Sequence, residues 1–240
     1  MRLLTYNIHK GIGGRDRRYR LERIVRVLEH EQPDIICLQE VDRHLDRSRF
    51  DDQPRLLAEH FNLPARMFQL NHHVATGGYG NLLLSRWPFG RHHQTSLRYR
   101  AKKNRGAQVA EVLTPSGPLR LVNWHLGLAE AERQWQAHTL LAHPAYTEIQ
   151  PAATLVVGDF NDWRDALKPL FAAQGLRSLT SPPSRFRTFP AWMAVGALDK
   201  VYACPRISLE RSHVVASRLA RVASDHLPLV VDFELSGNSL

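Results

Sequence analysis

The sequence predicts a single-domain α/β protein, a sandwich with mixed β-sheets. Three observations lead to this fold class. Short apolar runs typical of strands outnumber the helix-like stretches, and several of them adjoin one another, so simple alternation of strand and helix does not fit. No repeat, low-complexity tract or linker-like boundary divides the 240 residues. Because that length suits one large domain, we expect a single domain over residues 1–240.

The first part of the chain alternates strands with helices. Residues 2–8 form an apolar run typical of a strand, and residues 20–32 carry apolar side chains on one helical face. The run 34–41 is almost continuously apolar, as in strands that are covered on both faces. Residues 53–61 are predicted to form a second helix. A proline follows each of these helices and marks its end.

The remainder of the chain is richer in strands. Helices are predicted over 129–142 and, after a turn, over 164–173. The stretch 181–190 is rich in proline, serine and arginine and is predicted to be a surface loop. The expected strands are short apolar runs, at 80–85, 107–113, 119–124, 154–158, 198–203 and 227–233.

The aromatic residues divide into two groups. Trp124, Trp135 and Trp163 are expected in the core. Phe189 and Trp192 lie in the proline-rich loop, where an exposed ring could stack on a base or enter a lipid interface, although we expect at least one of them to pack in the core.

The composition excludes several classes of protein. With 43% apolar and 23% charged residues the chain is not intrinsically disordered, and two cysteines are too few for a disulfide framework or a cysteine-rich zinc module. No apolar run approaches the roughly 20 residues that span a bilayer, and no basic, apolar leader precedes the first motif. We therefore expect a cytoplasmic protein.

The charge is unevenly distributed. The formal net charge is +9, and residues 60–110 contain no carboxylate while carrying eight arginines and lysines. Such a surface attracts a polyanion, either nucleic acid or an anionic phospholipid headgroup. Since 27 of the 32 basic residues are arginine, the excess also agrees with a general compositional bias and does not name one partner.

Polar residues stand at the ends of six predicted strands or strand-like runs. Singly, each is more often a turn, a cap or a structural residue, but their repeated occurrence at strand ends indicates one functional rim. Four of these residues are carboxylates, which would repel one another unless a cation or a protonated histidine neutralised them. Carboxylate oxygens together with asparagine amides favour Mg²⁺ or Mn²⁺. The strand-end residues are Asn7, Glu40, His125, Asp159 with Asn161, Asp199, and Asp225 with His226.

Seven motifs in order resemble the DNase I-like endonuclease/exonuclease/phosphatase superfamily. They cover residues 5 to 228, with GDFND and SDHLP the most specific. The resemblance implies a four-layer α/β sandwich of two mixed sheets flanked by helices. It also implies cleavage of phosphoester bonds with a divalent cation, usually Mg²⁺. The motifs are TYNIHKG (5–11), LQEVD (38–42), GNLLLSRWP (80–88), VNWHL (122–126), GDFND (158–162), LDKVY (198–202) and SDHLP (224–228).

The resemblance also implies a role for each residue. Glu40, Asn7 and Asp225 match metal-binding positions, and Asp159 matches the residue that orients or deprotonates the attacking water. The remaining matches are Asn161, which holds that water or a phosphoryl oxygen, His226 with its partner Asp199, a second histidine at His125, and Asn81 near the phosphate. Arg105 directly precedes a predicted strand and could aim its guanidinium at the phosphate. Asn81 fits a strand cap equally well.

Three functions remain open at this stage. The first is Mg²⁺-dependent hydrolysis of phosphodiesters in nucleic acid, which the basic stretch 60–110 favours. The second is the same chemistry on a phospholipid or a small phosphoester. The third, a non-catalytic module that binds anions, fits least because the aligned catalytic positions retain competent residues.

Overall fold

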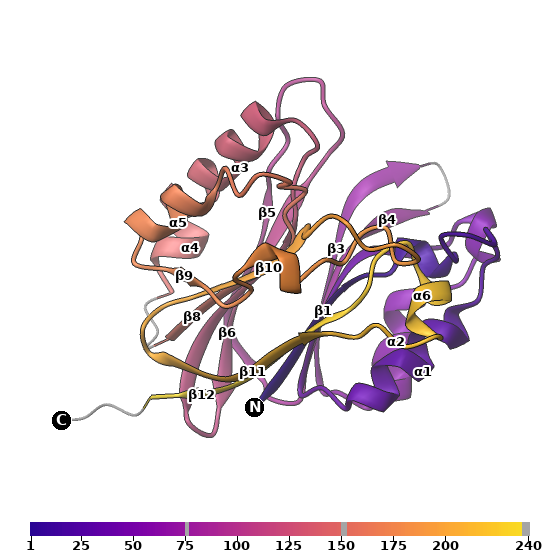
Figure 1. Ribbon diagram of the computed structural model, residues 1–240, viewed down its shortest axis with the longest axis horizontal. Coiled ribbons are helices and arrows are strands. Elements are labelled where there is room, and N and C mark those ends of the chain that lie inside the picture. The colour runs from indigo at the N-terminus through magenta and orange to yellow at the C-terminus, as the bar shows by residue number, and fades with distance from the viewer. Residues whose placement is uncertain (75–76, 150–152, 237–240) are drawn as a thin grey trace.

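The computed structural model describes residues 1–74, 77–149 and 153–236. Its strands form two six-stranded sheets, and helices lie on the outer side of each sheet (Figure 1). Both sheets are mixed, since each combines one parallel pair with antiparallel neighbours. The fold is therefore the four-layer α/β sandwich that the sequence resemblance implied.

The first sheet contains the beginning and the end of the described chain. Its one parallel pair is β1 with β2, and the other neighbours are antiparallel. The strands, in spatial order, are β11 (Ile207–Val214), β12 (Leu229–Leu235), β1 (Arg2–Asn7), β2 (Ile35–Arg43), β4 (Gly77–Ser85) and β3 (Ala65–Val74).

The second sheet repeats this arrangement. Its one parallel pair is β7 with β8, again surrounded by antiparallel neighbours. The strands, in spatial order, are β5 (Phe89–Ser96), β6 (Gly106–Thr114), β7 (Gly117–His125), β8 (Ala153–Asp159), β10 (Asp199–Ala203) and β9 (Arg177–Ser178).

Each sheet has its own helical layer. The first sheet buries its outer apolar side chains against one helical group, and the second sheet against the other (Figure 1). The layers are α1 (Leu21–Glu31), α2 (Gln53–Phe61) and α6 (Ala220–Ala223) on the first sheet, and α3 (Glu130–Ala142), α4 (Pro144–Thr147) and α5 (Lys168–Ala173) on the second.

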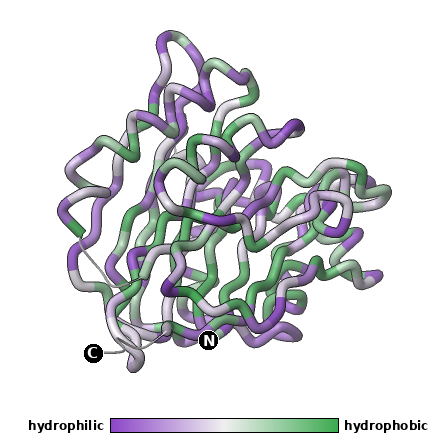
Figure 2. The backbone as a smooth tube through the Cα atoms, turned by 60° about the vertical axis from the view of Figure 1, so that its left-hand side comes forward, coloured by the Kyte–Doolittle hydropathy of each residue, from purple (hydrophilic) through white to green (hydrophobic). Residues whose placement is uncertain are grey.

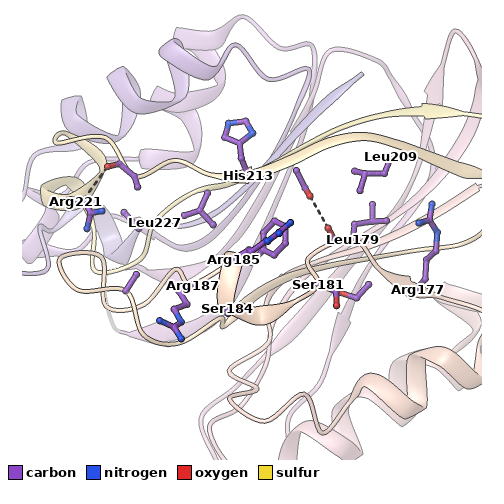
Figure 3. Close-up of a pocket in the computed structure, with 16 residues that line it drawn as sticks. Arg177, Leu179, Ser181, Ser184, Arg185, Arg187, Leu209, His213, Arg221 and Leu227 are labelled. Carbon is purple, nitrogen blue, oxygen red and sulfur yellow. Dashed lines mark hydrogen bonds between the residues drawn. The ribbon is translucent and has the colours of Figure 1, made fainter.

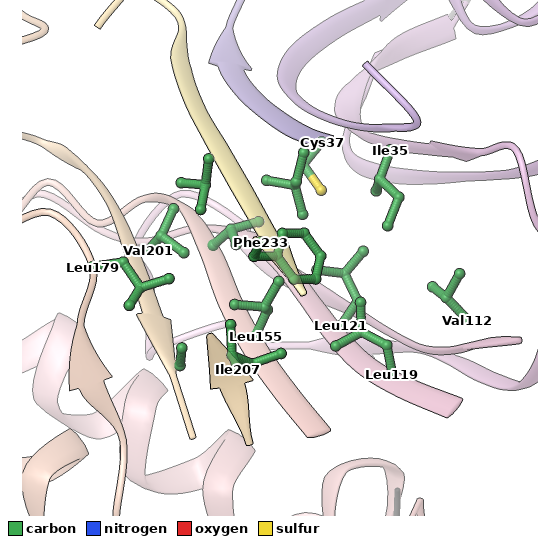
Figure 4. Packing of buried hydrophobic residues seen from close by; sticks show 14 of the residues in the cluster. Ile35, Cys37, Val112, Leu119, Leu121, Leu155, Leu179, Val201, Ile207 and Phe233 are labelled. Atoms are coloured by element: carbon green, nitrogen blue, oxygen red, sulfur yellow. The ribbon is translucent and has the colours of Figure 1, made fainter. Parts of the chain in front are cut away.

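The central core lies between the two sheets. Ile35 and Phe233 from the first sheet pack in one cluster with Leu121 and Leu155 from the second, and all four side chains are fully buried (Figure 4). Figure 2 shows the same division along the backbone, with hydrophobic strands inside and hydrophilic segments concentrated outside. This apolar layer fixes how the two sheets face each other, and hence where their strand ends meet.

The observed elements match the expected ones at the centre of each sheet and differ at the edges. The strand expected at 34–41 is β2, with almost every residue buried as its apolar run indicates. Four further strands were not expected, and each lies at a sheet edge: β3, β5, β9 and β11. The helix expected over 164–173 begins only at Lys168, because the Asp162 carboxylate accepts hydrogen bonds from the Ala166 and Leu167 amides and holds the preceding residues in a turn.

A buried chain of amide side chains links the two sheets. Gln39 Nε2 donates to Asn123 Oδ1 at 2.8 Å, and Asn123 Nδ2 donates to Gln108 Oε1 at 2.8 Å. Gln108 Nε2 then donates to the Met67 carbonyl at 2.7 Å. All three amides are fully buried. Since Gln39 precedes Glu40 and Asn123 lies near the end of β7, this chain holds together the strand ends that carry the predicted site.

We expect Asn123→Ala to lower the free energy of unfolding by about 2–4 kcal/mol. The substitution removes one of the three acceptors of Gln39 Nε2 and leaves the Gln108 Oε1 acceptor without its donor in a fully buried place. Urea denaturation followed by circular dichroism measures the change. Gln94→Ala is the control, because Gln94 also donates to a carbonyl but at the exposed edge. Equal losses in the two variants would contradict a stabilising role for the buried chain.

Candidate active site

The predicted site residues meet where the two parallel strand pairs end. Asn7 at the end of β1 lies opposite Gln39 in the register of β1 with β2. At the end of the other pair, His125 lies directly opposite Asp159. Carboxyl ends of neighbouring parallel strands place their side chains at one edge. We call this edge the rim; it carries Asn7, Glu40, His125, Asp159, Asp199 and His226.

Glu40 is turned toward the rim by an irregularity in β2. The register of β2 with β4 shifts between Leu38 and Val41, and Glu40 has a left-handed backbone with φ of 56°. A non-glycine residue in this region is uncommon, and bulges next to active sites often redirect a side chain. The Glu40 carboxylate is thereby brought against the ammonium group of Lys10, which also has a left-handed backbone. Although burial opposes ionisation of Glu40, Lys10 and the nearby histidines hold its pKa well below the usual value.

Asp159 is the centre of the rim and is almost fully buried, with 1% exposure. Its Oδ1 accepts from the Asn161 amide N–H at 2.9 Å, and its Oδ2 accepts from Asn7 Nδ2 at 3.0 Å. The same Oδ2 lies 3.3 Å from His125 Nε2 and 3.7 Å from His226 Nε2. The Oδ2 atom of Asp159 therefore faces two imidazoles and the side-chain amide of Asn7, and these groups come from both halves of the sandwich.

His226 and Asp199 form a buried pair across the two sheets. His226 Nδ1 lies 2.8 Å from Asp199 Oδ2, whereas Asp199 Oδ1 has no hydrogen-bond partner among the described residues. Burial by itself would lower the pKa of His226, but Asp199 and Asp159 raise that pKa to about 10. Ser224 fixes the position of the loop, because its hydroxyl donates to the Asn7 carbonyl at 2.7 Å and accepts from the His226 amide.

Asp159 and His125 are shifted toward their uncharged forms. Burial, with a contribution from Asp199, raises the pKa of Asp159 to about 6, although His226 acts in the opposite direction. Burial and the positive charge of Arg105 lower the pKa of His125 well below its usual value. The two histidines therefore differ at neutral pH: His226 is a cation and His125 is a neutral imidazole.

The remaining predicted residues lie around the rim. Asp225 has a carboxylate oxygen 3.8 Å from His9 Nε2. The Asn161 side chain donates to the Leu126 carbonyl, and Asn81 donates to the Gly106 carbonyl across the two sheets. Arg105 is buried near His125, and its Nε has no partner among the described residues. The observed Asn81 bond is structural, whereas Arg105 keeps a donor free.

Two contacts at the rim were not predicted from the sequence, and two tryptophans were predicted in the wrong environment. Lys10 lies within the first motif, but its charge gave no indication that it would reach Glu40. Phe189 lies against His226 with ring centroids 4.9 Å apart, and Trp163 packs edge-on against Phe189. Trp124 is buried as expected, but the core positions expected for Trp163 and Trp135 are wrong, since these side chains are 57% and 40% exposed.

A separate hollow of about 800 Å³ lies outside the rim. It runs between β11 and the segment around residues 181–187, and its lining includes Arg177, Arg185, Arg187 and Arg221 (Figure 3). The residues that line it include none of the predicted site residues. This hollow is therefore separate from the candidate site around Asp159.

A known protein family matches most of the chain. The profile of the endonuclease/exonuclease/phosphatase family matches residues 4–226, a span that contains every predicted site residue. The chain belongs to this family. Its members hydrolyse phosphoesters.

Individual relatives cover nearly the whole chain. The uncharacterized protein YbhP of Escherichia coli K12 is 30% identical, over 98% of this chain and 96% of its own length. An endonuclease/exonuclease/phosphatase structure from Beutenbergia cavernae matches with a TM-score of 0.83 at 24% identity, over 99% of this chain and 72% of that one. The mannosyl-6-phosphatase Bt3783 of Bacteroides thetaiotaomicron matches with a TM-score of 0.70 at 15% identity, over 98% and 100%. The two structural matches show the fold alone.

None of the helices in the described part of the chain combines the length and the apolar character that crossing a membrane requires.

Proposed function

We propose that this family member hydrolyses phosphodiester bonds of nucleic acid with a divalent cation, Mg²⁺ or Mn²⁺, and that residues 1–240 act as one catalytic domain in the cytoplasm. The observation that carries the proposal is the convergence of Asn7, His125 and His226 on the buried carboxylate of Asp159. Nucleic acid as the substrate is supported by the segment 60–110, which has eight basic residues and no carboxylate.

Glu40, Asn7 and Asp225 are the proposed metal-binding residues. Among the described residues, no three histidine, cysteine or acidic side chains form a ready-made metal cage. This agrees with Mg²⁺, which proteins usually hold with one or two carboxylates while water and substrate phosphate complete its shell. The Lys10 ammonium on Glu40 shows that this carboxylate accepts a cationic partner. When bound, the cation would supply charge neutralisation for the phosphate oxygens.

Different side chains of the rim would carry out the separate steps of proton transfer and charge stabilisation. Asp159, aligned by Asn7 and the Asn161 amide, would position a water molecule and accept its proton. His226 carries a proton that Asp199 stabilises, so it would donate that proton to the leaving oxygen. The neutral His125 would donate a hydrogen bond to a phosphoryl oxygen without bringing a second full charge.

The proposed function is tested by incubating the protein with plasmid, linear DNA and RNA, with Mg²⁺ and with EDTA. We expect cleavage that needs the cation and that an Asp159→Ala variant lacks. Cleavage by both proteins alike would show contamination, and no cleavage of any nucleic acid would overturn the substrate class. Calorimetry with Mg²⁺ and Mn²⁺ identifies the non-catalytic alternative, for which no metal binding is expected.

We expect Glu40→Gln to raise the Mg²⁺ concentration for half-maximal activity by about 10–100-fold. The amide keeps the shape of the side chain but removes the negative charge that attracts the cation. A titration of the rate with Mg²⁺ measures the shift. Glu59→Gln is the matched control, because Glu59 is an exposed acid paired with Arg55 on α2. A titration curve for Glu40→Gln that overlays the curve of Glu59→Gln would remove Glu40 from the proposed metal site.

A phospholipid is the second candidate substrate, and the apolar flank beside His226 favours it. Trp163, Trp192 and Met193 are 57%, 40% and 64% exposed, and Trp163 reaches His226 through Phe189. Exposed aromatic rings suit a lipid interface. Release of headgroup from phosphatidylglycerol vesicles, together with inactivity on DNA and RNA, would favour the lipid over nucleic acid.

A further inference from the structure

A basic hollow of about 780 Å³ lies beside the Glu40 side of the rim. It lies between residues 72–74 of β3, Tyr79 of β4 and the loop that precedes β6, and residues 45–47 after β2 line one side. We call it the Tyr79 hollow after the ring in its wall. Its cationic side chains are Arg47, Lys102 and Lys103, whereas Asp46 is the one carboxylate among the nine residues that line it.

The Tyr79 ring connects this hollow to the rim. The ring is 94% buried, since its exposure is 6%. Lys103 Nζ lies 5.0 Å and Arg47 Cζ lies 5.1 Å from its centroid. Lys10 Nζ lies 5.4 Å from the same centroid and pairs with Glu40. A single aromatic ring therefore lies between the cations of the hollow and the proposed metal-binding carboxylate.

The charges in the hollow differ in their freedom to bind a ligand. Arg47 is held by two hydrogen bonds of 2.8 Å to the fully buried Asp42, so its charge is largely compensated. Lys102 and Lys103 are exposed, and neither has a carboxylate partner within the described ranges of the chain. Burial and the charges of Lys103 and Arg47 lower the pKa of His72, which lies 5.0 Å from Tyr79 between ring centroids. Lys102 and Lys103 thus provide positive charge that no carboxylate compensates. The lowered pKa of His72 indicates that the hollow disfavours a further cation.

We propose that the Tyr79 hollow is a second phosphate subsite, which binds a backbone phosphate of a nucleic-acid strand beside the phosphate that is being cleaved. This inference rests on the proposed function and specifies how the strand lies on the protein. A strand with one phosphate at Asp159 carries further phosphates on either side, and Lys102 and Lys103 can neutralise the one that follows on the Glu40 side. Both lysines belong to the carboxylate-free segment 60–110. The Tyr79 hollow therefore shows where part of this basic segment could contact the substrate.

The test compares Lys102→Ala/Lys103→Ala with a charge-matched control, Lys168→Ala/Arg211→Ala. Both pairs are exposed, and the control residues lie on α5 and β11, outside the lining of the hollow. Binding of a fluorescent 12-nucleotide single strand is followed by anisotropy in EDTA, so that cleavage is not required. We expect the first variant to bind about 5- to 20-fold more weakly than the control and to lower the slope of log K against log salt by about 0.7, the value for one lost phosphate contact on a single strand.

A kinetic comparison completes the test with Mg²⁺ present. We expect the ratio of kcat/KM for the oligonucleotide to kcat/KM for bis(4-nitrophenyl) phosphate to fall about tenfold in Lys102→Ala/Lys103→Ala relative to the control. Equal affinities and equal salt slopes in the two variants would overturn the subsite while leaving the proposed function intact. If the unaltered protein neither binds nor cleaves the strand, the proposed function itself fails. Selective loss of binding to phosphatidylglycerol vesicles would assign the hollow to a membrane and overturn the inference.

Discussion

Replacing Asp159 by asparagine is expected to lower kcat on a phosphodiester substrate by about 10³- to 10⁴-fold. The amide has almost the same shape and can still accept the Asn161 N–H with its oxygen, but it cannot take a proton from water. Because burial raises the pKa of Asp159 to about 6, the carboxylate costs the folded protein stability at neutral pH. We therefore expect the melting temperature of the variant to stay within about 4 °C of the parent.

Steady-state kinetics and thermal unfolding of the same preparation distinguish a chemical effect from a structural one. Asp162→Asn is the matched control, since Asp162 is a neighbouring, fully buried aspartate whose carboxylate caps a turn and does not contact the histidines of the rim. That variant should lose stability and keep most of its kcat. If Asp159→Asn retained more than a tenth of the parental kcat, Asp159 could not be the group that accepts the proton.

Asp199→Asn is expected to lower kcat by about 10²- to 10⁴-fold at pH 8 and by much less at pH 5.5. In the parent, Asp199 and Asp159 raise the pKa of His226 to about 10, so the imidazolium persists throughout the neutral range. Without the charge of Asp199, the pKa of His226 falls, and deprotonation removes the acid as the pH rises. The loss of activity should therefore increase with pH between 5.5 and 8, which a pH–rate profile of both proteins measures.

The His226 resonance provides a readout that does not depend on turnover. In the parent, NMR titration of the imidazole should show no deprotonation below pH 9, whereas Asp199→Asn should titrate at clearly lower pH. The same linkage predicts stability: a histidine with a raised pKa stabilises the fold below about pH 6.5, and that contribution disappears as the pH rises through its folded value. A His226 titration that is identical in the two proteins would show that Asp199 does not determine the charge of the imidazole.

The sequence predicted the centre of each sheet but not its borders. Eight central strands have apolar runs because they are covered by a second sheet on one face and by helices on the other. The edge strands β5 and β11 leave side chains exposed, so their sequences, such as FGRHHQTS, lack an apolar run. β3 has buried residues on alternate positions, but one of them is the polar Gln69. Hydrophobic patterning thus identifies strands that are buried on both faces, but it does not identify edge strands.

The residues of the candidate site could be predicted for the same reason as the central strands. The strand-end residues were found because each stands next to a central, recognisable strand. Lys10 could not be predicted in this way, since its contact with Glu40 depends on left-handed backbone at both residues. The exposure of Trp163 likewise depends on how the loop before Asp199 folds over the rim, where Trp163 packs on Phe189. Such contacts arise from tertiary packing and carry no local sequence pattern.

The rim lies on the seam, that is, the interface between the two halves of the sandwich, each made of one sheet and its own helical layer. Asn7 and His226 belong to the first sheet and its flanking loop, whereas Asp159 and Asp199 belong to the second, so the bonds between them cross the seam. A phosphate held at the rim would bridge both halves and bind only when they are correctly docked. Its binding would therefore stabilise the whole folded sandwich by mass action, and occupancy of the rim would affect how cooperatively the two halves unfold.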